Sequence, residues 1–268
     1  MGGYGEVETL REAFDIQPAE VISLVGAGGK TTLMFALARE LMARKGVVIT
    51  TTTTKIYPPS LSDTPYVLVS EDGGEIRDFI LASGERYGHI TIVSERIASS
   101  GKLRGISTGL VNVLKNLKLV NYVIIEADGA AKRPLKAPNI AYEPVIPADT
   151  SLVIPVVGVD VLGHELQDEF VFRAEIAARL TGTKMGEIVS SDMIAILMTH
   201  PSGIIYGSPV HARVVPFINK VDFNDSLSDA RILASRILEA QHPQIDRVVL
   251  GQAKFRPPVL EVLYGRHF

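Results

Sequence analysis

The feature that most restricts the fold is an apolar strand that runs through a glycine-rich turn into an amphipathic helix. The strand VISLV occupies residues 21–25, and an apolar stripe of Leu33, Leu37 and Leu41 marks the helix. The turn between them consists of Gly26, Ala27, Gly28, Gly29, Lys30, Thr31 and Thr32. A strand, a glycine turn and a helix in this order predict an α/β fold with a binding site at the turn.

The residue types of this turn are those that bind the phosphates of a nucleotide. Glycines allow backbone amides to face an anion, and the start of a helix adds positive potential. Lys30 would reach the β- and γ-phosphates, and Thr31 would bind Mg²⁺. Leu24 stands where the full P-loop has its first glycine, so only G-x-x-G-K-T is present. The shortened loop resembles the ATP loop of the Mur and folylpolyglutamate ligases, and the alternative is a strand-to-helix turn with an incidental lysine.

Further apolar runs rich in β-branched residues alternate with helical patterns along the chain. Such runs are typical of a parallel sheet with helices on both faces. The sequence therefore predicts a P-loop NTPase-like α/β fold with a mainly parallel β-sheet. We expect residues 1–268 to form a single P-loop nucleotide-binding domain. A small subdivision of this domain after about residue 160 is compatible with the pattern. Strands are expected at 21–25, 47–50, 66–69, 89–93, 122–127, 152–159, 214–218 and 247–251, and helices at 30–45, 74–83, 106–118, 170–181, 191–199 and 226–241.

Composition excludes several classes of function. The 27 Lys and Arg against 30 Asp and Glu give a net charge of −3, which provides no basic field for a nucleic acid. The absence of cysteine excludes thiolate metal sites and a thiolate nucleophile. No apolar run approaches the roughly 20 residues of a membrane helix, and the acidic first twenty residues do not resemble a secretory signal. We expect a cytoplasmic protein that binds neither nucleic acid nor membrane, in an oligomeric state that the sequence does not specify.

A second motif is an apolar strand that ends in two acids, VIIEADG at residues 123–129. A buried strand that delivers a carboxylate beside a P-loop holds Mg²⁺ and positions the attacking water. Glu126 and Asp128 are two residues apart and would share one face of an extended segment. We assign Lys30, Glu126 and Asp128 to catalysis and Thr31, Glu126 and Asp128 to the metal, without deciding which carboxylate contacts it.

A third motif is Asn219-Lys220-Val221-Asp222, which follows the strand VVPFI. The Asp222 carboxylate could accept hydrogen bonds from guanine, while Asn219 meets the purine edge and the stem of Lys220 covers its face. This pattern favours GTP slightly over ATP. The alternative is a solvated turn in which Asp225 or Ser226 caps the next helix.

Two other segments contain candidate ligands. Thr53 and Lys55 follow the strand VVIT and could contact phosphate or Mg²⁺ at the rim of the site, although the neighbouring Thr50 and Thr51 suit an edge strand equally well. Lys132, Arg133 and Lys136 follow the acidic motif and could neutralise a γ-phosphate or bind an anion such as molybdate, selenide or a molybdopterin phosphate. A solvated basic loop is the alternative.

The three motifs G-x-x-G-K-T, hhhE-x-x-G and N-K-x-D together resemble those of the metallochaperone GTPases, which serve hydrogenase, urease and cobalamin maturation. A closer resemblance covers almost the whole chain. GAGGKTT, TTTTKIYPP, EADGAAKRPLKAPNIAYEPVIP, VVGVDVLG and INKVD are similar to the YqeC family, accessory proteins of selenium-dependent molybdenum hydroxylases. The matched positions are Lys30, Thr31, Thr53, Lys55, Glu126, Asp128, Lys136, Glu143 and Asp160. The family commonly has histidine in place of Lys55 and Tyr142.

The resemblance implies a nucleotide-dependent step in the maturation of such a hydroxylase, with GTP or ATP and Mg²⁺ as cofactors. The partners that it implies are the client molybdenum hydroxylase or the machinery of its cofactor. Two other hypotheses stay open: an ATP-dependent ligase or kinase that acts on a small anion, and a nucleotide-gated carrier of a selenium or molybdenum species.

Overall fold

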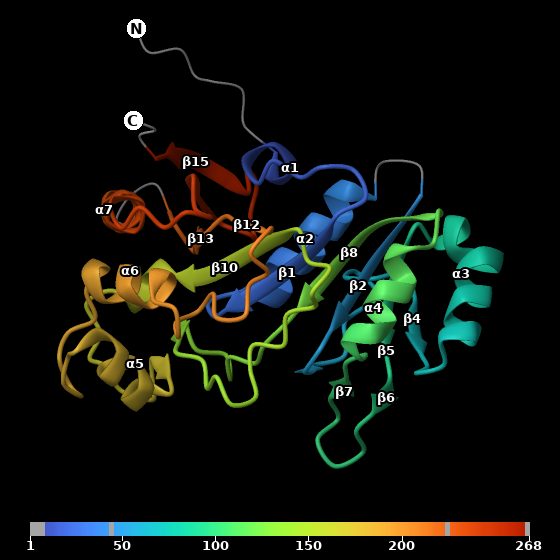
Figure 1. The fold of residues 1–268 in the computed structure, drawn as a ribbon, viewed down its shortest axis with the longest axis horizontal. Helices are drawn as coiled ribbons and strands as arrows, with labels where there is room; N and C mark the ends of the chain where they lie inside the picture. The colour runs from blue at the N-terminus through green and yellow to red at the C-terminus, as the bar shows by residue number, and fades with distance from the viewer. Residues whose placement is uncertain (1–8, 43–45, 223–225, 266–268) are drawn as a thin grey trace, which may run out of the picture.

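The computed structural model describes residues 9–42, 46–222 and 226–265, and in this part of the chain the main feature is a long, mostly parallel β-sheet (Figure 1). The strand order is β15-β14-β13-β10-β1-β8-β2-β5-β4, and β12 also pairs with β10. All pairs are parallel except β14 with β15, which is antiparallel. These strands are β1 (Val21–Gly26), β2 (Val47–Thr52), β4 (Val67–Val69), β5 (His89–Val93), β8 (Val120–Glu126), β10 (Leu152–Gly158), β12 (Arg213–Val214), β13 (Phe217–Asn219), β14 (Arg247–Gly251) and β15 (Val259–Tyr264).

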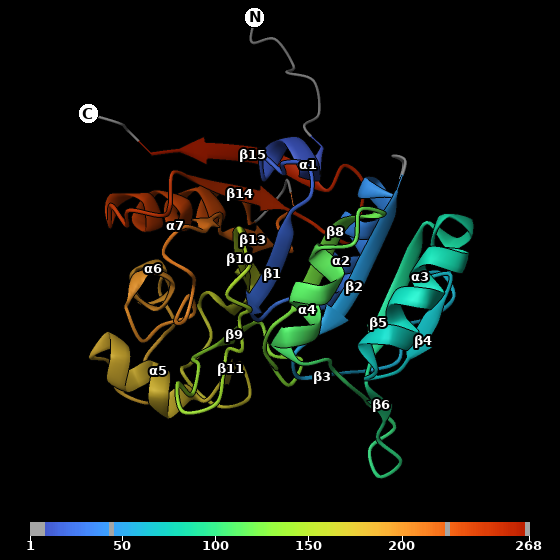
Figure 2. The same cartoon turned by 45° about the vertical axis from the view of Figure 1, so that its right-hand side comes forward.

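Helices cover both faces of this sheet, which confirms the predicted fold class. They are α1 (Leu10–Ala13), α2 (Lys30–Leu41), α3 (Gly73–Tyr87), α4 (Thr108–Lys115), α5 (Ala174–Thr181), α6 (Ser191–Thr199) and α7 (Leu227–Glu239). Alternate residues of the strands contribute to two separate cores. Leu24 packs with α1 and α2 on one face, whereas Val25 belongs to the core that contains residues of α3, α4, α5, α6 and α7. Figure 2 shows α3 and the α5–α7 group at opposite ends of the sheet.

Two small sheets lie beside the main one. The first pairs β9 (Leu135–Lys136) with β11 (Val171–Phe172) in parallel. The second contains β3 (Lys55–Ile56), β6 (Glu95–Arg96) and β7 (Leu103–Arg104), and its β6–β7 hairpin projects from the body of the molecule (Figures 1 and 2). Among the described residues, no helix is long and apolar enough to cross a membrane.

Some predicted elements differ from the observed ones. The strand expected at 214–218 is divided at Pro216 into β12 and β13, because proline has no amide hydrogen for the ladder. The antiparallel strand β15 was not predicted. The end that we expected for the helix over 30–45 lies outside the described residues, since α2 is described only to Leu41. The sheet itself extends past residue 160 through β13, β14 and β15, and the single-domain organisation stays a prediction.

The threonine run does not form an edge strand. Strand β2 lies inside the sheet, between β5 and β8. There the buried Thr50 hydroxyl contacts His89 Nε2 at 2.9 Å and the Thr91 hydroxyl at 2.7 Å. Threonine therefore suits this strand because cross-strand partners satisfy its hydroxyl inside the sheet.

The buried His89 makes the fold sensitive to acid. Burial is the main reason why the pKa of His89 falls from 6.5 to about 4, and the positive charge of Arg39 lowers it further. The unfolded chain therefore binds this proton near pH 6.5, and the folded chain binds it only near pH 4. Stability that is complete above pH 6.5 is lost as the pH falls towards 4, by about 3 kcal/mol.

We predict that His89→Gln reduces this acid-dependent loss of stability, since glutamine can bond to Thr50 without titrating. Urea unfolding of both proteins at pH 7 and pH 4.5 measures the difference. His211→Gln removes an exposed histidine and should leave the loss unchanged. An equal loss in the His89 and His211 variants would contradict the assignment.

Candidate functional site

The parallel register brings the three predicted motifs to one edge of the sheet. Strand β1 lies between β8 and β10, and Leu24 pairs with Glu126 while Gly26 pairs with Val156. On the next strand but one, Asn219 pairs with Gly158. The carboxyl ends of β1, β8, β10 and β13 therefore meet around the glycine-rich turn, where ligands of open α/β sheets bind.

The turn has the backbone of a phosphate loop. Gly28 has a φ of 79° and lies so close to Gly158 that a Cβ on Gly28 would collide with the Gly158 backbone. Helix α2 starts at Lys30, and the first-turn amides of Lys30, Thr31 and Thr32 have no acceptor within a helix. Such amides at the positive end of a helix are the groups that bind anions in other proteins, and anion binding by this turn stays a prediction.

The Lys30 ammonium is buried against the two acids of the second motif. Its Nζ donates to the Gly26 carbonyl at 2.6 Å and lies 3.1 Å from Asp128 Oδ1 and 3.7 Å from Glu126 Oε1. Only 2% of the Lys30 side chain is exposed. Burial lowers the pKa of Lys30, but the charges of Asp128 and Glu126 outweigh it and hold the pKa above its usual value. The lysine is therefore charged and paired.

Glu126 connects this lysine with the start of helix α2. Its Oε2 accepts a 2.6 Å hydrogen bond from the Thr31 hydroxyl. Burial raises the pKa of Glu126, and the charge of Lys30 and the Thr31 hydrogen bond oppose that rise. Thr31, Glu126 and Lys30 thus form one contiguous group, and their roles as metal and phosphate ligands stay predictions.

Asp128 holds the first residue of the phosphate loop by a hydrogen bond. Its Oδ2 accepts a 3.0 Å hydrogen bond from the Gly26 amide. Its Oδ1 is close to Lys30, yet it is one of only two buried side-chain atoms among the described residues that lack a hydrogen bond of good geometry. A buried carboxylate oxygen with spare acceptor capacity is available for a cation or a water.

These residues fit a magnesium ion that is shared with a nucleotide. No group of three or more His, Asp and Glu side chains among the described residues could hold a metal alone. Mg²⁺ usually uses one or two carboxylates and completes its shell with phosphates and water. Thr31, Glu126 and Asp128 supply that number of oxygens beside the anion site.

Lys136 extends the ion pairs away from the phosphate loop. Its Nζ lies 3.0 Å from Asp128 Oδ2 and 3.0 Å from Glu143 Oε1, and it donates to the Gly129 carbonyl at 2.6 Å. Glu143 also pairs with Arg173. Positive and negative groups therefore alternate from Lys30 through Asp128, Lys136 and Glu143 to Arg173.

Arg173 is a site residue that sequence reasoning missed. It has a φ of 63°, precedes α5, and its guanidinium lies 4.5 Å from the Phe172 ring centre and 5.2 Å from that of Tyr142. No local motif marks Arg173 in the sequence. Its left-handed backbone, which is common at functional positions, is seen only in the structure.

The other two predicted cations of this segment do not join the cluster. Arg133 Nε donates to the Asp168 carbonyl at 2.7 Å, and Lys132 Nζ lies 4.9 Å from the Tyr57 ring centre. The backbone of the segment contacts the loop instead, because the Gly28 amide donates to the Arg133 carbonyl at 3.0 Å. Of the predicted basic group, only Lys136 reaches the acids.

Thr53 and Lys55 have a looser relation to the site. The Thr53 amide donates to the Glu126 carbonyl at 3.2 Å, and its hydroxyl donates to the Val145 carbonyl at 2.7 Å. Thr53 thus ties the acidic strand to the segment that follows Glu143. Lys55 is exposed in β3, within the small three-stranded sheet, and its role as a ligand stays a prediction.

Asn219 bridges the phosphate loop and a second loop. Its Nδ2 donates to the Gly28 carbonyl at 2.7 Å, and its Oδ1 accepts from the Ala253 amide at 2.9 Å. Nothing in the sequence motif indicated that Ala253, which lies in the segment after β14, belongs to this region.

Of the remaining residues of the third motif, Lys220 and Asp222 are exposed, whereas Val221 is buried. The Asp222 amide donates to the Ser226 hydroxyl at 2.8 Å, so Ser226 forms part of the turn before α7 and makes no side-chain cap on that helix. Lys220 has a φ of 63°, and its Nζ donates to Asp160 Oδ2 at 2.6 Å. Asp225 lies outside the described residues. The motif is thus placed beside the phosphate loop with an exposed carboxyl group.

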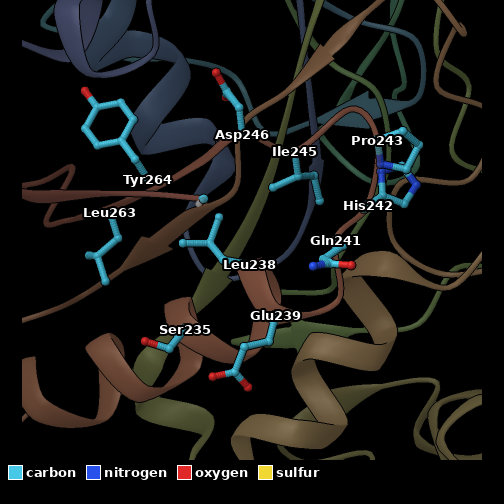
Figure 3. Close-up of a pocket in the computed structure, with 11 residues that line it drawn as sticks. Ser235, Leu238, Glu239, Gln241, His242, Pro243, Ile245, Asp246, Leu263 and Tyr264 are labelled. Carbon is cyan, nitrogen blue, oxygen red and sulfur yellow. The ribbon is translucent and has the colours of Figure 1, made fainter. Parts of the chain in front are cut away.

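A groove of about 880 Å³ lies elsewhere on the molecule (Figure 3). It is lined by the end of α7, the segment between α7 and β14, and the end of β15, including Leu238, His242, Asp246 and Tyr264. Asp246 precedes β14, so this groove is at the amino edge of the parallel sheet, opposite the phosphate loop. We therefore place the candidate site by chemistry and topology, because groove size does not indicate it.

Comparisons with known proteins agree with the motifs. The family model described as YqeC protein matches residues 22–175, which include the phosphate loop, the acidic strand and Arg173. The YqeC protein of Escherichia coli (strain K12) is 34% identical over 241 residues, which cover 89% of this chain and 90% of the relative. The chain therefore belongs to the YqeC family.

Proposed function

We propose that this protein binds and hydrolyses a nucleoside triphosphate with Mg²⁺ in the maturation of a selenium-dependent molybdenum hydroxylase. The observation that carries the nucleotide part is the convergence of Lys30, Thr31, Glu126 and Asp128 at the start of α2. The maturation part rests on the similarity to the YqeC family. In the absence of cysteine, selenium or metal transfer through a protein thiolate is not part of the proposal.

The arrangement of charges supports a requirement for Mg²⁺ and nucleotide together. The Lys30 ammonium is neutralised by Asp128 and Glu126, so a phosphate that approaches alone also meets two carboxylates. Mg²⁺ would neutralise those carboxylates and the phosphates at the same time. Lys30 would then turn from Asp128 to the β- and γ-phosphates, while Lys136 continues to hold Asp128 in place.

Hydrolysis by the isolated protein should be slow. Transition-state charge in such reactions is often stabilised by an arginine. Arg173 is connected to the site through the ion pairs of Glu143 and Lys136. Its guanidinium is held in place by Glu143 and by the rings of Phe172 and Tyr142. A partner that supplies or releases a cation would accelerate turnover, which suits a maturation factor that acts on a client.

The first test is a calorimetric titration of the protein with MgGTP and MgATP. We predict that Lys30→Ala weakens binding of the preferred nucleotide by about thirtyfold or more, because a buried charged contact is lost. Lys115→Ala serves as the control, because it removes an exposed lysine of α4 that is paired with Asp149. Unchanged affinity in a folded Lys30 variant would contradict the phosphate-loop assignment.

A second prediction concerns binding without Mg²⁺. Asp128→Asn should increase the affinity for nucleotide in EDTA several-fold, because it removes a negative charge and releases Lys30. The same variant should lose most of the stimulation by Mg²⁺. Fluorescent-nucleotide titrations with EDTA or Mg²⁺ measure both effects. Weaker binding in EDTA, with the fold intact, would show that the Asp128 carboxylate does not compete with phosphate.

The base preference is the third prediction. Asp222→Ala should reduce affinity for MgGTP about tenfold and leave MgATP unchanged, because the carboxylate pairs with the guanine amino and N1 groups only. Asp78→Ala, which removes an exposed carboxylate from α3, is the matched control. If MgATP binds more tightly and Asp222 has no effect, the motif is a structural turn and ATP chemistry is favoured.

A second candidate function, an ATP-dependent ligase or kinase, is favoured by a polar cavity at the same sheet edge. The cavity has a volume of about 570 Å³ and is lined by Glu71, Asp72, Ser94, Arg104 and Ser107, among others. Gly105, which also lines the cavity, packs against Thr52. The Thr52 hydroxyl donates to the Glu126 carbonyl at 2.7 Å, and this contact connects the cavity with the acidic strand. A small acceptor bound there would lie near the nucleotide. Product analysis for inorganic phosphate against a phosphorylated acceptor separates the two functions.

A further inference from the structure

The ion pair between Asp160 and Lys220 lies where the nucleoside part of the nucleotide would bind. The two residues follow the ends of the neighbouring strands β10 and β13, whose last residues Gly158 and Asn219 are paired. The Lys220 ammonium donates to Asp160 Oδ2 at 2.6 Å. The pair therefore crosses the two strand ends beside the phosphate loop.

Gly158 provides the floor under this pair. A Cβ on Gly158 would collide with Asp160 Oδ1 and lie 3.3 Å from Lys220 Cδ. On its other side Gly158 packs against Gly28 of the phosphate loop. A side chain at position 158 would therefore displace the Asp160 carboxylate, and Gly158 lies between the Lys220 stem and Gly28 of the phosphate loop.

Stability alone does not explain this arrangement. Lys220 and Asp160 are 44% and 47% exposed, and exposed ion pairs contribute little to folding. Lys220 also has a left-handed backbone, which disfavours residues other than glycine. Asn219, the preceding residue, is held by hydrogen bonds to Gly28 and Ala253, so the strand end presents Lys220 in one direction.

We propose that Asp160 is a positioning residue that holds the methylene stem of Lys220 in place as an apolar surface for the nucleotide base. This inference rests on the proposed nucleotide site. Without Asp160, a flexible lysine would have to be ordered by each binding event, which costs affinity. Because a methylene stem covers any purine, the effect applies to GTP and ATP alike, in contrast to that of Asp222.

The experiment compares MgGTP, MgATP and magnesium tripolyphosphate, which has the phosphates without a nucleoside. Asp160→Ala should weaken both nucleotides about threefold to tenfold. Binding of tripolyphosphate should stay equal or become slightly tighter, since a negative charge near an anion site is removed. Asp160→Glu, which keeps a carboxylate, should lose less nucleotide affinity than Asp160→Ala. The Asp78→Ala control should lose no affinity.

A double-variant cycle separates positioning from a general structural effect. In a Lys220→Ala background, Asp160→Ala should have no further effect on nucleotide affinity. Unchanged nucleotide affinity in Asp160→Ala, or an equal loss in the Lys220→Ala background, would overturn the inference while leaving the phosphate site intact. If wild-type protein binds neither tripolyphosphate nor nucleotide, both the proposed function and this inference are wrong.

Discussion

The structure of the candidate site depends on the buried carboxylate of Asp128. It accepts the Gly26 amide, faces Lys30 and pairs with Lys136. Only 1% of its side chain is exposed, so an unpaired charge here would be strongly unfavourable. Removal of one partner from such a buried pair typically costs about 3–5 kcal/mol. The Asp128 carboxylate therefore contacts the glycine-rich turn at Gly26, Lys30 at the start of α2 and Lys136 of the following segment at the same time.

The two ends of the site are built in different ways. The proposed phosphate end is buried, and its positive and negative side chains neutralise each other, which would favour phosphate that arrives together with a divalent cation. The base end uses exposed residues, Lys220, Asp160 and Asp222, on the ends of β10 and β13. We therefore expect the buried end and the Lys220–Asp160 pair to contribute affinity for any purine nucleotide, and Asp222 to discriminate between guanine and adenine. The link from Lys136 through Glu143 to Arg173 connects the buried end with the start of α5.

Several parts of this site could be predicted because they depend on short-range patterns. The glycine turn, Lys30 and the acids that end a buried strand are adjacent in sequence to the elements that place them. Other parts depend on distant segments. Arg173 and Ala253 reach the site through side-chain and backbone contacts with residues 30 and 34 positions away in sequence. The position of β2 between β5 and β8 likewise depends on the order of the strands in the sheet. The threonines of β2 do not indicate that order.

The sequence by itself determined the α/β class, the phosphate loop and the acidic strand, because local periodicity and glycine content limit what each segment can form. It did not determine which cations face the acids. Lys132, Arg133 and Lys136 are all basic residues of one segment, so the sequence does not distinguish them. Only Lys136 faces the acids, because it lies in β9, which pairs with β11. The tertiary structure decided this because a buried charge requires a partner within a few ångströms, and that distance is set by the packing of segments remote in sequence.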